Sequence, residues 1–270
     1  MDIVSFLQFT FIQRALVAGI FIAVLCAILG MFLVLRRMSL IGDGLAHVTF
    51  GAIALGLFFG MYPFAVAVPL VVAGSYLILK ISEKAKVYGD AAIGIVSAVG
   101  IAGGILLASL SGGFNVDLFS YLFGNILAIS STEVALSIVL SITVLGAIYL
   151  FYQEIFAAAF DEEFARVSGL RTSRINTLLV SLTAVSVVLS VRVVGIMLIS
   201  ALLILPAVTA LQHARSLARA LLAAAGYAVL SVLLGIALSF YADLPTGATI
   251  VMANAAFFGT ALLYKRFAGS

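Results

Sequence analysis

The first long apolar segment, residues 13–35, reads QRALVAGIFIAVLCAILGMFLVL and has no charged residue after Arg14. About 20 such residues in a helix are enough to cross the roughly 30 Å hydrocarbon core of a bilayer. Further apolar segments follow along the whole chain. They lie at 44–61, 63–81, 91–110, 132–152, 175–191, 194–211, 220–241 and 247–264. The sequence therefore predicts an all-α, polytopic integral membrane protein with roughly nine transmembrane helices, within a range of eight to ten.

The composition excludes the other broad classes of protein. Of the 270 residues, 64% are hydrophobic and 9% are charged, and the mean hydropathy is +1.31. Soluble domains are typically about half apolar and about a quarter charged, and their cores cannot bury this much apolar surface. Strands of a membrane barrel alternate polar and apolar residues over about ten positions, which these unbroken runs do not do. We expect residues 1–270 to form one transmembrane domain without a soluble domain.

Lys and Arg gather in alternate connections, and this bias predicts the orientation. If Arg36 and Arg37 are cytoplasmic, alternate crossings place every other Lys and Arg inside as well, except Arg14 and Arg192. Cytoplasmic loops carry the excess of these residues, so we expect the amino terminus outside and the carboxyl terminus inside. The prediction depends on 175–211, where two short segments are barely separated. A re-entrant segment there would change both the helix count and the terminal orientation.

Two connections are longer than the others. The outer one, 111–131, has an amphipathic, aromatic middle, and we expect a short interfacial helix near 116–129. The inner one contains AFDEEFARVSGLRTS, the longest polar stretch of the chain. We expect a short cytoplasmic helix near 155–171, opened by the acids 161–163, which the helix dipole favours, and ended by Gly169. This helix is too small to be a domain but large enough to contact another protein.

Asp43 and His47 are the ionisable pair that interrupts an apolar segment, in MSLIGDGLAHVTFGAIALG. A carboxylate inside the membrane costs about 2.5–3.5 kcal/mol on insertion scales, so it marks a functional candidate. The i, i+4 spacing puts both side chains on one helix face, where they could bind a divalent cation such as Zn²⁺ or Mn²⁺. A symmetric dimer would supply two Asp and two His. A purely structural alternative remains, in which Asp43 caps the helix and His47 donates to a carbonyl.

The remaining polar residues carry weaker signals. Asp117 and Asp243 are expected near the outer mouth, where they either attract cations or lie solvated in loops. His213, beside Arg215 on the predicted cytoplasmic side, is interpreted as an ordinary surface residue. The sequence contains neither an HExxH zinc-protease motif nor a GxxxxGK[ST] phosphate loop, and Asp43 has no second membrane aspartate for protease chemistry. We therefore expect no enzymatic activity from this chain.

Four segments, taken together and in order, resemble the permease subunits of ATP-binding-cassette importers for zinc and manganese. The likeness extends over essentially the whole chain, which makes it more specific than any single motif. The segments are RRMSLIGDGLAHVTFGAIALG (36–56), DLFSYLFGNILAIS (117–130), VVGIMLISALLILPAVTA (193–210) and YADLPTGATIVMANAAFF (241–258).

The resemblance implies a machine of several chains in the bacterial plasma (inner) membrane. Two copies of this chain would form a pathway in membrane lipid, an ATPase dimer would dock below, and a metal solute-binding protein would deliver the ion from outside. No resident cofactor and no nucleic acid are implied. Asp43 and His47 fall on the metal-handling pair of the family. The coupling helix that contacts the ATPase would comprise Asp161, Glu162, Glu163, Phe164, Ala165 and Gly169, with Ala165 and Gly169 packing into the ATPase cleft.

The identity of the metal follows less directly from the resemblance. The motif GDGLAHV resembles the corresponding motif of zinc permeases more closely than that of manganese permeases. This resemblance predicts Zn²⁺ as the cargo, with Mn²⁺ or Fe²⁺ as the alternative. A stand-alone cation channel or secondary transporter is the rival class, and it would need no soluble subunits.

Overall fold

The computed structural model describes residues 8–84, 89–111, 121–122, 124, 129–196 and 199–268, and all the regular structure in these ranges is helical. The helices are α2 (Thr10–Leu35), α3 (Ile41–Phe58), α4 (Pro63–Lys84), α5 (Gly89–Leu110), α7 (Ser131–Leu150), α8 (Tyr152–Phe160), α9 (Glu162–Val167), α10 (Thr172–Val194), α11 (Ile199–Leu211), α12 (Leu217–Ala242) and α13 (Thr246–Ala268). The prediction of an all-α protein is confirmed. The outer helix expected near 116–129, with Asp117, lies almost entirely outside the described residues.

Eight of the described helices are long and apolar enough to cross a membrane: α2, α3, α4, α5, α7, α10, α12 and α13. The difference from the predicted nine lies at 175–211. There α10 is a full-length helix, whereas α11 has 13 residues and, at 1.5 Å per residue, covers only about 20 Å. Gly195, with φ of 87°, ends α10 and separates the two. The described part of the chain therefore contains eight helices long enough to span a membrane and one shorter apolar helix, α11.

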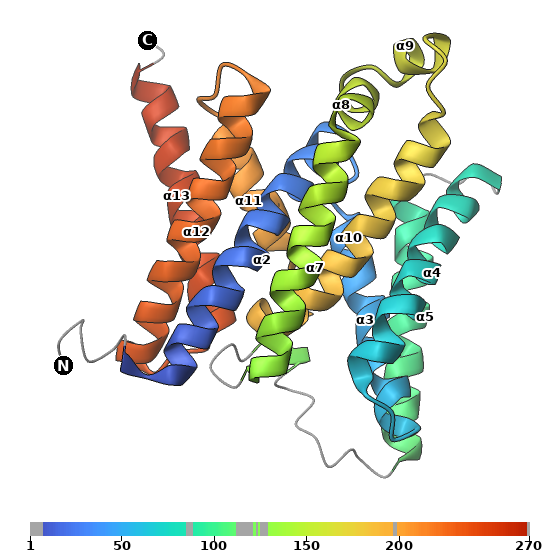
Figure 1. Cartoon of the computed structure of the whole chain (residues 1–270), viewed down its shortest axis with the longest axis vertical. Helices are drawn as coiled ribbons and strands as arrows, with labels where there is room; N and C mark the ends of the chain where they lie inside the picture. Colours follow the sequence, from blue (N-terminus) through green and yellow to red (C-terminus); the bar gives the residue numbers. More distant parts are fainter. Residues whose placement is uncertain are drawn as a thin grey trace.

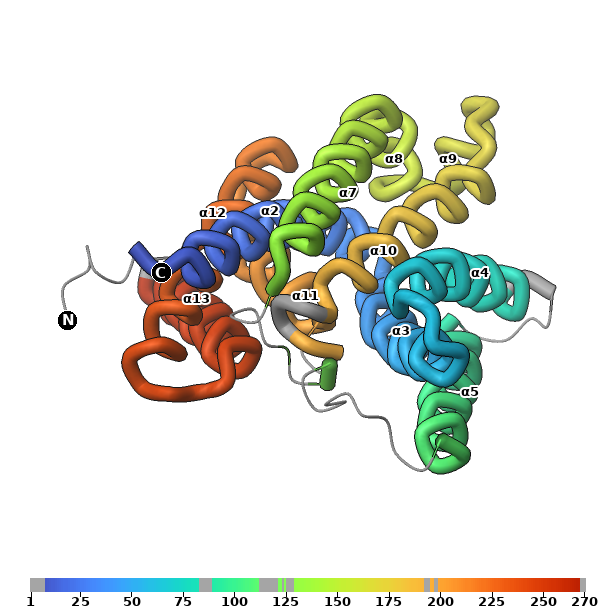
Figure 2. The backbone as a smooth tube through the Cα atoms, turned by 60° about the horizontal axis from the view of Figure 1, so that its bottom comes forward, coloured from blue at the N-terminus to red at the C-terminus, as the bar shows by residue number. Residues whose placement is uncertain are grey.

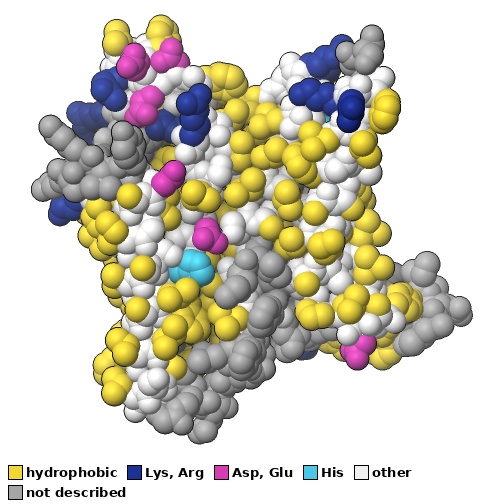
Figure 3. Space-filling view, turned by 180° about the vertical axis from the view of Figure 1, so that it is seen from behind, with side chains coloured by type: hydrophobic (Ala, Val, Ile, Leu, Met, Phe, Trp, Pro, Cys, Tyr) yellow, Lys and Arg dark blue, Asp and Glu magenta, His cyan; other side chains and the backbone are white. Residues whose placement is uncertain are grey.

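The long helices run side by side and alternate in direction (Figure 1). Helices α8 and α9 and the carboxyl terminus lie at one end of the molecule, and the amino terminus lies at the other. On the face seen in Figure 3, Lys and Arg side chains gather at the end that carries α8 and α9, while hydrophobic side chains cover the middle. This distribution is the one expected for a protein whose middle zone faces lipid.

Helix α2 is the centre of the packing. It is apolar on all sides, which is typical of a helix surrounded by protein, and it contacts α7, α10, α11 and α12. Figure 2 shows α3, α4 and α5 grouped on one side of this centre and α12 and α13 on the other. The group formed by α3, α4 and α5 is held mainly by contacts of α3 with its two neighbours.

Glycines allow α3 and α5 to approach each other closely. A Cβ atom added at Gly100 on α5 would lie 2.8 Å from the Cα of Val48 and 3.0 Å from the carbonyl oxygen of His47. Conversely, a Cβ at Gly51 on α3 would overlap the carbonyl oxygen of Gly100. Small residues at helix contacts in membranes bring backbones together and increase van der Waals packing. This contact therefore fixes the position of α3 at the level of His47.

We expect Gly100→Ala to destabilise the protein by about 1–3 kcal/mol, because the new methyl group meets backbone atoms of α3 that cannot rotate away. Thermal unfolding of the purified protein in detergent measures the change. Gly94→Ala on the same helix is the matched control, since a Cβ at Gly94 meets nothing within 4 Å. Equal unfolding temperatures for the two variants would show that the backbones are not in contact there.

Candidate functional site

The start of α3 places Asp43 on a partly exposed face of the helical bundle, next to α11. The chain reverses between α2 and α3 over Arg36–Leu40, with Arg37 in the left-handed region (φ 55°) and the Met38 amide donating to the Leu33 carbonyl at 2.9 Å. Asp43 then lies in the first turn of α3, where the helix dipole favours a carboxylate. The residue at the N-cap position is Leu40, and no side chain caps the helix. The structural alternative in which Asp43 caps α3 is therefore wrong.

Asp43 and His47 face each other on α3. His47 Nε2 lies 3.7 Å from Asp43 Oδ2, and the side chains are 19% and 45% exposed, respectively. His47 Nδ1 is buried and has no hydrogen-bond partner among the described residues, so the expected bond from His47 to a backbone carbonyl is not seen. The pair thus combines a carboxylate that solvent can reach with an imidazole that is mostly enclosed.

Ser200 is a third member of the site. It lies at the start of α11, and its hydroxyl donates to Asp43 Oδ1 at 3.1 Å. One carboxylate oxygen of Asp43 thus faces α11 and the other faces His47. The sequence analysis did not single out Ser200. The available signal was a hydroxyl residue in an apolar segment just after Gly195, where irregular backbone at membrane depth is tolerated only if it lines a cavity or packs against protein.

One chain supplies few metal ligands at this place. Among the residues that the structure describes, no cluster contains three or more His, Cys, Asp or Glu side chains. Asp43, His47 and Ser200 offer two oxygen donors and one nitrogen donor. Cys26, the single cysteine, is buried elsewhere, with its sulfur 3.1 Å from the hydroxyl of Ser190. The site is therefore an oxygen and nitrogen site without thiolate.

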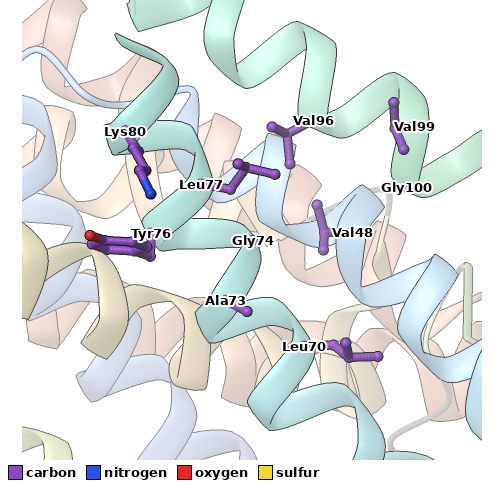
Figure 4. Close-up of a pocket in the computed structure, with 10 residues that line it drawn as sticks. All are labelled: Val48, Leu70, Ala73, Gly74, Tyr76, Leu77, Lys80, Val96, Val99 and Gly100. Atoms are coloured by element: carbon purple, nitrogen blue, oxygen red, sulfur yellow. The ribbon is translucent and has the colours of Figure 1, made fainter. Parts of the chain in front are cut away.

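The cavity in Figure 4 is a different feature. It lies between α4 and α5 beside α3, has a volume of about 430 Å³, and is lined mostly by apolar side chains such as Val48, Leu70 and Val99. Lys80 is the charged residue of the lining, with its Nζ 5.7 Å from the centre of the Tyr76 ring. It contains no carboxylate or imidazole, so it is not a metal site.

The inner connection forms two short helices that are fastened to the core. Arg36, at the end of α2, donates to the Ala158 carbonyl of α8 at 2.6 Å and forms an ion pair with Glu162 of α9 at 3.0 Å. The other carboxylate oxygen of Glu162 accepts from Asn176 of α10 at 3.2 Å. Because the Arg36 side chain is only 7% exposed, solvent and salt screen this ion pair less than a surface pair. It ties α9 to the turn that leads into α3.

The range 155–171, expected to contain one short helix, is divided at Asp161 into α8 and α9, and α9 is capped at both ends. Asp161 is the N-cap, and its carboxylate accepts from the Phe164 amide at 2.9 Å. At the other end, the Gly169 amide donates to the Arg166 carbonyl and the Leu170 amide to the Ala165 carbonyl, a Schellman motif. Gly169 has φ of 89°, which favours glycine. The segment is thus a rigid, capped turn of helix.

The exposed surface of this segment differs from the prediction at one residue. Ala165 is fully buried within this chain, so its side chain is not available to a partner in this structure. The apolar side chains that solvent reaches are Phe160, Phe164 and Val167, which are 61%, 68% and 88% exposed. Glu163 is exposed as well. Asp243 follows the last residue of α12 and has a left-handed backbone conformation. This end of α12 lies at the opposite end of the molecule from α9 (Figure 1).

Comparisons with known proteins identify the family. The model of the ABC 3 transport family matches residues 8–265. The manganese transport system membrane protein MntC of Listeria monocytogenes is 31% identical over 258 residues, which cover 96% of this chain and 92% of that protein. The manganese import system permease protein ScaB of Streptococcus parasanguinis is 34% identical over 251 residues, covering 93% and 89%.

A solved structure shares the fold over the same length. PsaBC from Streptococcus pneumoniae, in complex with Fab, superposes with a TM-score of 0.87 at 30% sequence identity, covering 96% of this chain and 95% of that chain. Since the family match and these relatives extend over nearly the whole chain, the chain belongs to the ABC 3 transport family, as a multi-pass permease subunit of a divalent-metal importer whose ATPase is a separate protein.

Proposed function

We propose that two copies of this chain form the pathway by which Mn²⁺ crosses the membrane into the cytoplasm. The observation that carries the proposal is the cluster of Asp43, His47 and Ser200, which brings oxygen and nitrogen donors from α3 and α11 together. Asp43 and His47 bind the ion, and Ser200 positions the Asp43 carboxylate. Two ligands from one chain hold a metal weakly, and a second copy of α3 completes the coordination. A low ligand number lets the ion leave again.

The cargo differs from the one that the sequence analysis favoured. The motif GDGLAHV favoured Zn²⁺, but MntC and ScaB are described as manganese proteins, which supports the alternative cargo, Mn²⁺. The donors agree with Mn²⁺, because carboxylate and hydroxyl oxygens suit this harder ion and no thiolate is present. At such a site Zn²⁺ still binds more tightly than Mn²⁺, in the Irving–Williams order. Selection therefore rests on the protein that delivers the ion, and Zn²⁺ acts as a competitor.

The orientation follows from the distribution of charge. The end that carries α8, α9 and the carboxyl terminus also carries most of the Lys and Arg, which supports its placement in the cytoplasm, with the amino terminus outside. A solute-binding protein then docks at the opposite end, near Asp243. The outer connection that contains Asp117 lies outside the described residues.

Coupling to the ATPase runs through α9 and Arg36. The exposed side chains of Phe164 and Val167 offer an apolar contact for the ATPase at the cytoplasmic end. The ion pair between Glu162 and Arg36 transmits a displacement of α9 to the turn Arg36–Leu40, and α3 with Asp43 begins directly after that turn. ATP binding and hydrolysis thereby change access to the metal site.

We expect Asp43→Asn and His47→Ala to abolish Mn²⁺ uptake, because each removes a ligand, and Ser200→Ala to reduce it about tenfold through loss of the hydrogen bond to Asp43. Uptake of radioactive Mn²⁺ by cells that lack the native chain measures the effect. Asp90→Asn is the matched control, an acid in the first turn of the neighbouring α5. Normal uptake by Asp43→Asn at normal expression would refute the site, and uptake of Zn²⁺ without Mn²⁺ would refute the cargo.

We expect Phe164→Glu to abolish co-purification of the ATPase, because it puts a charge into the apolar contact. Glu162→Ala should leave the ATPase bound and yet lower uptake, because it removes the partner of Arg36. Glu163→Ala, an exposed acid in the same turn, is the control for the change of charge. Equal uptake by the variants at positions 162 and 163 would exclude the transmission through Arg36, and unaltered co-purification with Phe164→Glu would exclude the contact.

A further inference from the structure

A second polar pocket lies at the α8–α9 end of the molecule, away from the metal site. It has a volume of about 640 Å³ and is formed where the connection between α11 and α12 meets the last turns of α13. Its lining includes an imidazole, a guanidinium and three hydroxyl groups, from His213, Arg215, Tyr227, Thr260, Ala261 and Tyr264. The proposed transport cycle uses none of these residues. Their chemistry is that of a site for an anion.

The charge around this pocket is strongly unbalanced. Between positions 199 and 268 the basic residues are Arg215, Arg219, Lys265 and Arg266, whereas the single acid, Asp243, lies at the far end of α12. Arg215 takes part in no ion pair among the described residues. In Figure 3, Lys and Arg side chains cluster over the ends of α12 and α13, without an acidic side chain beside them on that face. The pocket therefore has cationic groups but no anion of its own.

Aromatic rings and apolar side chains border the pocket. The Tyr227 ring lies edge-on to the His213 ring, and its hydroxyl is 3.5 Å from His213 Nε2. The centres of the Tyr227 and Phe257 rings are 5.6 Å apart. Tyr264 and Phe267 on α13 are 68% and 78% exposed, and Leu222 on α12 is exposed as well. Tyr residues are enriched at the level of lipid head groups, where a polar tip and an apolar body are both satisfied. The surroundings thus fit a ligand with a charged head and apolar chains.

We propose that this pocket binds the phosphate of an anionic phospholipid of the inner leaflet. Arg215 and His213 donate to the phosphate, the hydroxyl of Tyr227 adds a further hydrogen bond, and the acyl chains lie along the exposed apolar faces of α12 and α13. Basic pockets between transmembrane helices on the cytoplasmic side are suited to acidic head groups. The exposed apolar surface favours a lipid over a free phosphate ion, which could use only the polar half of the site.

The test uses the full-length permease with its ATPase in nanodiscs of phosphatidylcholine alone or with added phosphatidylglycerol. Phosphatidylglycerol should raise the unfolding temperature and remain bound in native mass spectrometry. Arg215→Gln should weaken its binding about fivefold, and Tyr227→Phe should weaken it to a smaller degree. Arg174→Gln, an exposed arginine on α10 at the same end, should bind like the unchanged protein.

Three results would overturn the proposal. Equal losses in Arg215→Gln and Arg174→Gln would show general attraction to a charged surface. Displacement of phosphatidylglycerol by millimolar inorganic phosphate, with equal stabilisation, would show a free-phosphate site. Loss of the ATPase from Arg215→Gln, with lipid binding retained, would show that the basic corner contacts protein. Retained ATPase, with lipid binding lost selectively in Arg215→Gln and Tyr227→Phe, is the result that supports the site.

Discussion

The absence of water from the hydrocarbon core is the constraint on which this structure depends. Every backbone amide and carbonyl at that depth must find a partner within the protein, so the chain folds into helices and leaves them only where other groups compensate. Four buried hydroxyls find partners in the same way, because Thr49, Thr183, Ser190 and Thr209 donate to carbonyls one turn earlier in their own helices. Asp43 differs from these residues, because its carboxylate accepts a hydrogen bond from Ser200 on another helix.

The site depends on this packing in two ways. Gly100 lets α5 touch the backbone of α3 at His47, and Gly42 lies against the Leu203 side chain of α11. These contacts hold two helices against α3 where it carries its ionisable residues, one of them the helix that contributes Ser200. At the end that carries α8 and α9, Arg36 joins α2, α8 and α9 just before the turn into α3. The proposed ATPase contact and the proposed metal site are thus linked through this turn.

Much of this could be predicted from the sequence, for identifiable reasons. Hydrophobic length determines the spans, and Asp161 and Gly169 act through local capping geometry, which needs no tertiary information. The failures involve tertiary contacts. The length of α11 depends on where the chain leaves α10, Ser200 acts across helices, and the burial of Ala165 depends on how α9 docks. The identity of the cargo is a different case, since Asp and His can hold either ion, and the manganese proteins among the relatives favour the alternative over Zn²⁺.

The place where α11 begins has an electrostatic consequence. The positive end of its dipole, equivalent to about half a unit charge, points at Asp43 through the first turn that contains Ser200. This field repels a divalent cation that binds to Asp43, because both are positive. At the proposed metal site, the same short helix therefore lowers the depth of the energy well for the ion and favours brief residence over storage.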